Sequence, residues 1–206
     1  MNTQVFIKSI MAGVMIGIAG LIFLNVQHQI IGSIMFSFGL LMVLSKGYFL
    51  YTGKVGYLLP YEKGYLMILL KTLIGNALGI MIIALLYRFS GATEIISRAE
   101  SLYMMKLSNT WYQTLMLSIL CGMMMYIAVQ SYHKQKIDLL KILIVILSVA
   151  IFILAKFEHS VANMLYLMLG QVFSLKSLLY LMIMVIGNAI GAISLNLIEC
   201  QLEKHK

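Results

Sequence analysis

The sequence predicts an all-helical bundle embedded in a membrane, and three observations lead to this prediction. Of the 206 residues, 62% are hydrophobic and only 11% are charged. The chain contains several apolar runs longer than the roughly 18 residues that mark a membrane-spanning helix. These runs do not alternate between polar and apolar residues, so helices rather than barrel strands would satisfy their backbone hydrogen bonds in lipid.

Six membrane-spanning segments are expected, at about residues 6–25, 30–60, 64–88, 107–131, 138–170 and 177–199. The first segment has the hydropathy of a signal peptide, but it lacks a small-residue cleavage site and five further spans follow it. A polar stretch, RFSGATEIISRAE, separates the third segment from the fourth and is expected to be a linker.

The formal net charge of +8 is interpreted as a topology signal and not as a sign of nucleic-acid binding, because the Lys residues are scattered between apolar segments. With both termini in the cytoplasm, the inner segments hold Lys8, Lys63, Lys71, Lys134, Lys136, Lys141, Lys204 and Lys206, and the outer segments hold Arg88, Arg98, Lys106 and Lys176. This distribution follows the positive-inside rule. We therefore expect a multi-pass protein of a bacterial plasma (inner) membrane.

The second and fifth segments are each about 30 residues long, half as long again as a bilayer needs. Polar or glycine residues interrupt both near the middle, with SKGYFLYTGKVG (Ser45 to Gly56) in the second and AKFEHSVAN (Ala155 to Asn163) in the fifth. Polar backbone at membrane depth persists only where it is buried in protein or lines a watery cavity. Both segments are therefore predicted to be broken helices.

Nearly the same string occurs in the third and sixth segments, GNALGI from Gly75 to Ile80 and GNAIGA from Gly187 to Ala192, 112 residues apart. The interrupted centres, Thr52 and Glu158, lie about 106 residues apart. This matching offset predicts an internal duplication of three spans each. The predicted repeats are residues 6–90 and 106–199, within a single domain of residues 1–206. Because three is an odd number, the repeats are inverted and the broken helices face each other at mid-membrane.

Five ionisable residues are expected at membrane depth, namely Lys46, Lys54, Lys156, Glu158 and His159. They are candidates for function, because even the lower insertion scales assign about 3 kcal/mol to a charge at the centre of a spanning helix. His159 is the main candidate, since imidazole can give a proton to a passing anion near neutral pH. The alternative is a buried histidine that only hydrogen-bonds a neighbour. Helical spacing would place Lys156, His159 and Asn163 on one side.

Other polar residues leave two interpretations open. Glu158 would point elsewhere on such a helix, and we expect it to be structural, accepting hydrogen bonds from backbone N–H groups around Thr52 to Lys54. Asn76 and Asn188, beside the glycines of the GN strings, either form interhelical hydrogen bonds or line a pore. Lys106 either draws anions to an outer mouth or is an ordinary interfacial lysine.

Sequence motifs of enzymes are missing. The chain has no paired-carboxylate centre, HExxH, GxSxG or P-loop string, so neither an enzyme activity nor a cofactor is expected. Cys121 and Cys200 lie in apolar context without CxxC or His-rich spacing, which predicts packing residues and no metal site or disulfide.

Five strings resemble the formate/nitrite transporter family: FEHSVANM (Phe157 to Met164), LYTG (Leu50 to Gly53), the two GN strings and KLSNTW at the start of the fourth segment. The resemblance extends from the first span to the sixth, and FEHSxAN is a specific motif. It implies an aquaporin-like fold and a homopentamer with one pore per subunit. It also implies that the cargo is formate, nitrite, hydrosulfide or a similar small anion.

The resemblance also implies roles for individual residues. The central pore histidine would be His159, the facing loop residue Thr52, the vestibule lysine Lys106, the inner constriction Leu50 and Tyr51, the outer constriction Phe152, and the pore asparagine Asn188. The chain departs from the family pattern at four positions. Phe49 stands where an acidic residue is common, Lys54 where a polar residue follows the motif, Gly122 where an Asn is expected, and Lys156 where a small residue precedes FEH.

These expectations combine into a proton-linked transport mechanism. A bare anion in a dry constriction carries an idealised Born cost on the order of 20 kcal/mol, which a neutral acid largely avoids. Lys106 would attract the anion, His159 would supply or relay a proton, and Thr52 would hydrogen-bond the cargo. Lys156, if it faced the same cavity, would disfavour protonation of His159. The alternatives are a neutral small-solute channel, in which His159 only hydrogen-bonds its cargo, and a non-transporting membrane scaffold.

Overall fold

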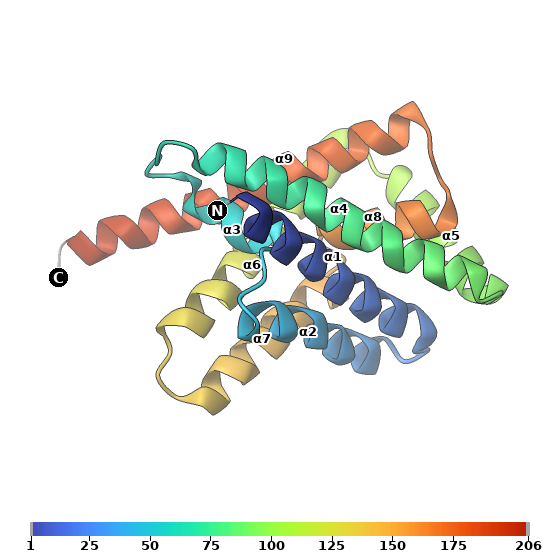
Figure 1. Ribbon diagram of the computed structural model, residues 1–206, viewed down its shortest axis with the longest axis horizontal. Coiled ribbons are helices and arrows are strands. Elements are labelled where there is room, and N and C mark those ends of the chain that lie inside the picture. Colours follow the sequence, from blue (N-terminus) through green and yellow to red (C-terminus); the bar gives the residue numbers. More distant parts are fainter. Residues whose placement is uncertain (1, 205–206) are drawn as a thin grey trace.

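The computed structural model describes residues 2–204, and the regular structure in that range is entirely helical, as predicted. The helices are α1 (Asn2–Asn25), α2 (Gln29–Ser45), α3 (Tyr51–Lys54), the short 3-10 helix η1 (Val55–Leu58), α4 (Tyr65–Phe89), α5 (Thr93–Leu107), α6 (Trp111–Lys134), α7 (Asp138–Leu154), α8 (Ser160–Gly170) and α9 (Leu175–Lys204). Figure 1 shows them as a bundle whose long helices run roughly side by side.

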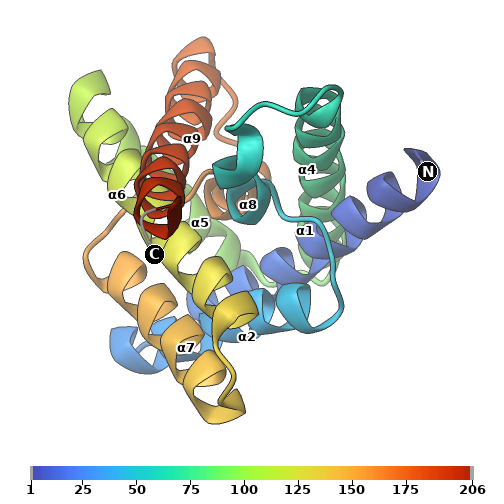
Figure 2. The ribbon, with the colours of Figure 1, turned by 90° about the vertical axis from the view of Figure 1, so that its left-hand side faces the viewer.

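Four of these helices are long and apolar enough to cross a membrane, judged by length and composition. They are α1 over Thr3–Asn25, α4, α6 and α9, with mean hydropathies of 2.2, 2.1, 1.6 and 2.1. Helix α1 packs on α4, α6 packs on α9, and α2 packs on α7. Figure 2 shows these three pairs around the shorter helix α8. The interrupted segments contain the shorter helices α2, α3 and η1 in one case and α7 and α8 in the other.

The two predicted interruptions are present, and each contains a residue with positive φ. Helix α2 ends at Ser45, Gly47 has φ +60°, and α3 begins at Tyr51 after an extended residue, Leu50. Helix α7 ends at Leu154, Lys156 has φ +58°, and α8 begins at Ser160. The left-handed region suits glycine, so Gly47 adopts it without strain, whereas a lysine there is uncommon.

The polar linker predicted between the third and fourth segments is helical. Its residues form α5 from Thr93, and Lys106 lies in the last turn of this helix and not at the start of the next one. Helix α5 ends at Leu107, and helix α6 begins at Trp111. Thr110 and Gln113 form a reciprocal capping box at the start of α6. The cap satisfies the backbone N–H groups of Thr110 and Gln113, which would otherwise lack partners. A new helix therefore begins here, separate from α5.

Close helix packing explains one departure from the family pattern. A Cβ atom added to Gly122 in α6 would overlap the backbone oxygen of Asn188 in α9. Gly13 in α1 meets the backbone oxygen of Asn76 in α4 in the same way. The helices of both pairs approach so closely that no side chain fits at either glycine.

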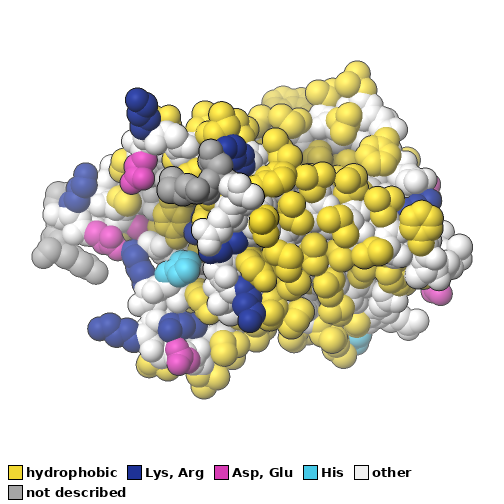
Figure 3. Space-filling model, viewed as in Figure 1, with side chains coloured by type: hydrophobic (Ala, Val, Ile, Leu, Met, Phe, Trp, Pro, Cys, Tyr) yellow, Lys and Arg dark blue, Asp and Glu magenta, His cyan; other side chains and the backbone are white. Residues whose placement is uncertain are grey.

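Each end of the bundle is held by its own polar contacts. We call one end of the bundle the terminus side; it carries η1 and the last turns of α6 and α9. On the terminus side, Asn196 Nδ2 donates to the carbonyl of Leu59 over 2.7 Å. At the opposite end, the far side, Arg88 Nη1 donates to the carbonyl of Leu169 and Arg98 Nη1 to that of Leu24, each over 2.6 Å. Figure 3 shows a broad hydrophobic band between the two ends, with most charged side chains of that face near the terminus side.

Candidate functional site

The two helix breaks meet at a buried contact between Thr52 and His159. Thr52 follows the first residue of α3, and His159 precedes the first residue of α8. The distance from Thr52 Oγ1 to His159 Nε2 is 2.9 Å, and the two residues are only 1% and 2% exposed. The chain thus brings together two residues that are 107 positions apart.

The other ring nitrogen of His159 identifies its tautomer. Nδ1 accepts a hydrogen bond from the backbone N–H of Ala162 over 3.1 Å, so in the neutral ring the proton resides on Nε2. The Nε2–H group therefore donates to Thr52 Oγ1. This assignment leaves the hydroxyl hydrogen of Thr52 available to a third group, and it directs the single imidazole proton toward α3.

Aromatic and aliphatic side chains enclose the His159 ring. Phe152 stacks on it with ring centroids 5.5 Å apart and planes 20° apart, and Phe36 meets Phe152 edge-on. Leu50 and Tyr51, the predicted inner constriction, are buried like Phe152, and the Tyr51 hydroxyl donates to the carbonyl of Val185. The proton-bearing group thus lies in an apolar environment, in which hydrogen bonds are stronger than in water.

Two asparagines hold the two breaks in the same way. Asn76 Oδ1 accepts from the N–H of Tyr51 over 2.8 Å, and its Nδ2 donates to the carbonyls of Phe49 and Ser9, each over 2.8 Å. The same three contacts recur at Asn188. Its Oδ1 accepts from Ser160 N over 2.9 Å, and its Nδ2 donates to the carbonyls of Glu158 and Ser118, each over 2.8 Å.

These contacts are the interhelical hydrogen bonds of the first interpretation of Asn76 and Asn188, and the pore-lining interpretation stays a prediction. Both side chains are fully buried, and each uses its oxygen and both of its N–H groups on backbone partners. The backbone at a helix break lacks intrahelical partners, and leaving it unpaired in lipid costs several kcal/mol per group. We call each arrangement an asparagine clamp, Asn76 at the first break and Asn188 at the second.

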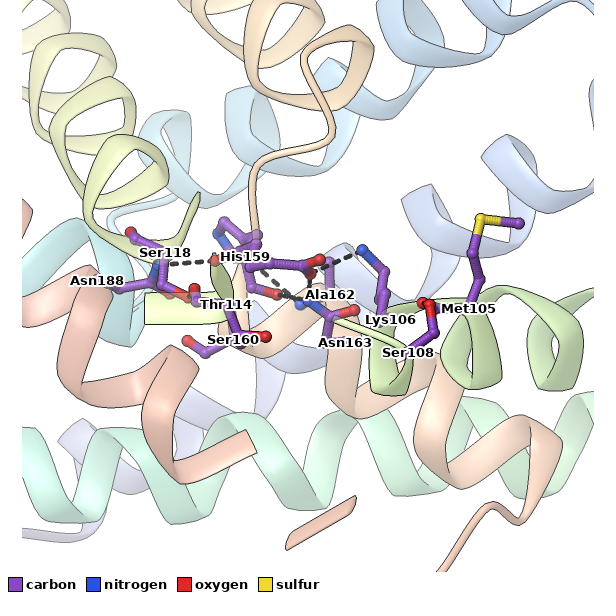
Figure 4. Close-up of polar contacts among 11 residues, drawn as sticks. Met105, Lys106, Ser108, Thr114, Ser118, His159, Ser160, Ala162, Asn163 and Asn188 are labelled. Atoms are coloured by element: carbon purple, nitrogen blue, oxygen red, sulfur yellow. Dashed lines mark hydrogen bonds and ion pairs between the residues drawn. The ribbon is translucent and has the colours of Figure 1, made fainter. Parts of the chain in front are cut away.

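Glu158 forms a different set of contacts from the one predicted. Its Oε2 accepts from Lys106 Nζ over 2.7 Å and from Asn163 Nδ2 over 2.8 Å. Figure 4 shows Lys106 and Asn163 on the same side of His159. The N–H groups near Thr52 are not its partners: that of Tyr51 goes to Asn76, and that of Gly53 to the carbonyl of Leu50. The expectation was wrong because Glu158, which precedes α8, points toward Lys106 in the last turn of α5.

Lys106 lies beside the second break, but it is paired. Its side chain is 18% exposed and that of Glu158 is 2% exposed. The two charges largely cancel, so Lys106 presents less positive potential to an approaching anion than an isolated ammonium would. Asn163 connects the pair to the histidine, because its Nδ2 also donates to the backbone carbonyl of His159 over 3.0 Å.

Lys46 and Lys156 are both exposed and lie in the two breaks, and their depth in a membrane stays a prediction. Lys156 has positive φ and precedes α8, so it does not share a helical face with His159 and Asn163. The prediction assumed a continuous helix through residue 156, and the break invalidates that spacing.

Three buried oxygens near the second break have no hydrogen-bond partner among the described residues: Thr114 Oγ1, Ser160 Oγ and Asn163 Oδ1. All three residues are at most 1% exposed, and Figure 4 shows them around His159 and Asn188. Sequence reasoning missed Thr114 and Ser160, because a hydroxyl in an apolar helix commonly bonds its own backbone and gives no distinctive pattern. Buried polar groups of this kind are suited to bind an ordered water.

Comparison with known proteins gives a consistent result. Residues 2–198 match the family model described as Formate/nitrite transporter. The chain is 27% identical over 186 residues to the formate channel FocA of Haemophilus influenzae, covering 80% of this chain and 66% of that protein. It is 27% identical over 190 residues to FocA of Escherichia coli K12, covering 82% and 67%. The chain spans about two thirds of the length of these relatives.

Solved structures show the same fold. A structure described as a pentameric formate channel with formate bound superposes with a TM-score of 0.86 at 21% identity, covering 100% of this chain and 98% of that one. A second, described as an FNT family ion channel, gives a TM-score of 0.83 at 22% identity, covering 93% and 86%. The relatives are named as channels, which agrees with the prediction that the chain is not an enzyme.

Proposed function

The chain belongs to the formate/nitrite transporter family, as its motifs predicted, and we propose that it passes a small monovalent anion of the formate, nitrite or hydrosulfide class across a membrane. The observation that carries the proposal is the buried Thr52–His159 contact where the two helix breaks meet. Polar groups at the centre of a membrane protein are characteristic of a transport pathway, because a packed core without such a role favours apolar residues.

The proposed architecture has six spans in two inverted repeats. The spans are α1, α2 with α3 and η1, α4, α6, α7 with α8, and α9, and α5 connects the repeats, about 6–90 and 106–199. The matched asparagine clamps support the duplication, and so do two backbone bonds: Phe49 N–H to Lys8 O at 3.3 Å and Glu158 N–H to Leu117 O at 3.2 Å. We propose five such subunits in a bacterial inner membrane, with both termini cytoplasmic.

The geometry at His159 constrains how a proton can reach the cargo. The neutral ring has one N–H group, on Nε2, and complete loss of that proton would leave an unfavourable imidazolate. Full proton transfer therefore requires a second proton on Nδ1, where the N–H of Ala162 now donates. Proton-linked transport thus needs the first turn of α8 to loosen, after which Nε2–H transfers to the anion and the neutral acid crosses the apolar constrictions.

The remaining residues would support this step. Thr52 would exchange its bond to Nε2 for one to the cargo. Leu50, Tyr51 and Phe152 would exclude water, while Glu158 and Asn163 hold Lys106 at the far-side mouth. Lys156 is exposed beyond that mouth, so we propose that it raises the local anion concentration without acting on His159 directly.

A neutral-solute channel is the second candidate, and the observation that favours it is the His159 tautomer. A neutral imidazole with a capped Nδ1 is a hydrogen-bond donor at Nε2, which is all that such a channel requires. Flux that ignores pH and membrane voltage would support it. In a third candidate, a non-transporting scaffold, the polar centre would only hold the helices together.

The test is stopped-flow uptake of formate, nitrite and hydrosulfide into proteoliposomes, with and without an inward proton gradient. We expect at least one anion to enter in a proton-dependent way, and His159→Ala to lose this flux or its proton dependence. His28→Ala is the matched control, because His28 is exposed and its loss should change neither. If wild-type vesicles are no leakier to all three anions than empty vesicles, the anion proposal is wrong.

A further inference from the structure

A groove on the far side of the bundle combines a free positive charge with exposed apolar surface. We infer that it binds an anionic glycerophospholipid, whose phosphodiester is held by Lys176 and Gln171 and whose acyl chain follows the exposed face of α9. Such a site is independent of the proposed cargo, because it takes a lipid from the surrounding membrane and not a solute that crosses it.

The groove lies between the end of α5 and the turn that joins α8 to α9. Its volume is about 500 Å³, within the roughly 300–1,000 Å³ that is usual for small-molecule sites. Figure 1 shows this turn at the end of the bundle opposite the C-terminus. The residues that line the groove come from both segments and are Met104, Leu107, Ser108, Gln171, Val172, Phe173, Ser174 and Lys176.

The groove is separate from the mouth at Lys106. Met104, Leu107 and Ser108 follow one another at the helical spacing i, i+3 and i+4, so they share one face at the end of α5. Lys106 lies two residues after Met104, on a different face, from which it reaches Glu158. Neither member of the Lys106–Glu158 pair lines the groove. A ligand bound there would therefore lie outside the proposed transport pathway.

Two hydrogen bonds between the walls keep the groove in shape. The hydroxyl of Tyr103 in α5 donates to the carbonyl of Ser177 in α9 over 3.0 Å, and that of Tyr180 in α9 donates to the carbonyl of Asn109 over 2.7 Å. Lys176 Nζ lies 5.4 Å from the centroid of the Tyr180 ring. A cation–π contact of this kind stabilises an ammonium without cancelling its charge. The charge of Lys176 is therefore held beside the groove and remains available to a ligand.

The charges of the lining favour an anion that carries no amine. The ion pairs found within residues 2–204 do not include Lys176, and none of the eight lining residues is acidic. Lys176 also lies in the first turn of α9, where the positive end of the helix dipole attracts a negative group. The amine of phosphatidylethanolamine would meet this charge without an acidic partner. Phosphatidylglycerol, which has a phosphodiester and no amine, fits the groove better.

The backbone of Gln171 is a separate observation that points to a ligand. Gln171 ends α8 with φ +54°, in the left-handed region that favours glycine. Its side chain is exposed and lines the groove. The amide can donate two hydrogen bonds to phosphate oxygens. A glutamine at a position where glycine would be less strained is explained by a binding role for its side chain.

Apolar side chains at the groove suit an acyl chain. Met104 and Phe173 line the groove, and both are exposed. Along α9 the exposed apolar surface continues with Leu178, Leu179 and Met182. A free phosphate would leave this surface uncovered, whereas an acyl chain would cover it. The combination of one ammonium and this surface therefore favours a phospholipid over a water-soluble phosphate.

The test is native mass spectrometry of the detergent-solubilised protein, titrated with dioleoyl phosphatidylglycerol or dioleoyl phosphatidylethanolamine. We expect wild type to bind phosphatidylglycerol about 5-fold more tightly and Lys176→Gln to lose this preference, since one lysine near anionic headgroups contributes about that factor. Gln171→Gly should weaken phosphatidylglycerol binding while the melting temperature stays close to that of wild type, because glycine suits the left-handed backbone. Lys63→Gln removes an exposed lysine on the terminus side and should leave both affinities unchanged.

Several outcomes would overturn the lipid site. Equal affinities of wild type for the two lipids would do so, and so would a preference that survives in Lys176→Gln. Displacement of phosphatidylglycerol by glycerol phosphate at equal concentration would show a site for a water-soluble phosphate instead. A cryo-EM structure of the protein in phosphatidylglycerol nanodiscs locates the lipid directly. Lipid density at Lys176 supports the site, and a second subunit packed over the groove refutes it.

Discussion

The break after α2 and the break after α7 share a backbone arrangement but carry different chemistry. An asparagine clamp holds each one through a helix N–H and two carbonyl groups, at distances that agree within 0.1 Å, since all six are 2.8 or 2.9 Å. The side chains on these equal supports differ: Phe49, Leu50 and Tyr51 in the first break, and Glu158, His159 and Ser160 in the second. The two breaks therefore share the contacts that satisfy their backbone groups and differ in the side chains that these contacts support.

The largest effect should come from removing a clamp. Asn188→Ala leaves the N–H of Ser160 and the carbonyl of Glu158 without their side-chain partner at the break, and we expect it to lower the free energy of unfolding by about 3 kcal/mol. Asn76→Ala should have nearly the same effect, because its three contacts are the same. The measurement is thermal or denaturant unfolding of the detergent-solubilised protein.

Asn25→Ala is the control for the clamps. Asn25 is exposed and bonds Leu21 and Tyr87 at the end of α1, so its loss should change the unfolding free energy by less than about 0.5 kcal/mol. A large difference between Asn76→Ala and Asn188→Ala would show that the two clamps are not equivalent.

An intermediate effect is expected at the acidic residue that only the second break has. Glu158→Gln leaves the largely buried Lys106 without its counter-charge, and we expect a loss of about 2 kcal/mol in stability, since Lys106 retains some solvent access. Lys106→Met in the same protein should recover part of that loss, because it removes the unpaired charge. Unfolding experiments on the single and double variants measure both effects.

The matched control for Glu158 is a half-exposed acidic residue, Glu199. Glu199→Gln weakens the contact with Lys134 on the terminus side, where both side chains are more than 40% exposed, and should cost at most about 0.5 kcal/mol. Equal losses from Glu158→Gln and Glu199→Gln would contradict the view that burial makes the second break sensitive to charge.

We expect the smallest effect on stability at the Thr52–His159 contact, which joins the two breaks. Its effect on transport should be clear. Thr52→Val keeps the shape of the side chain and removes the oxygen that accepts from His159 Nε2, so we expect a roughly 10-fold fall in anion flux. Proteoliposome uptake measures it. Thr72→Val is the control, because the buried Thr72 hydroxyl bonds only its own helix at Ile68 and should leave flux unchanged.

Several features were predictable from the sequence because they depend on local composition. Long apolar runs must form helices in lipid, and polar residues inside two of them required breaks, which lie at Lys46–Leu50 and Ala155–His159. The repeated GN strings identified the residues that now form the clamps. The motif around His159 indicated the family, which the match over residues 2–198 establishes.

The partners of the charged and polar side chains were decided only by the tertiary structure. The sequence shows that Glu158, Lys106 and Phe49 exist, but not that Glu158 faces Lys106 across 2.7 Å while two lysines share the Phe49 ring. The prediction that Lys156 shares a helical face with His159 was wrong, because Lys156 lies in the break before α8, where the backbone is not helical. Local sequence determines where a helix can persist. The direction of a side chain across a break depends on how the helices pack, and packing depends on contacts between residues more than 100 positions apart.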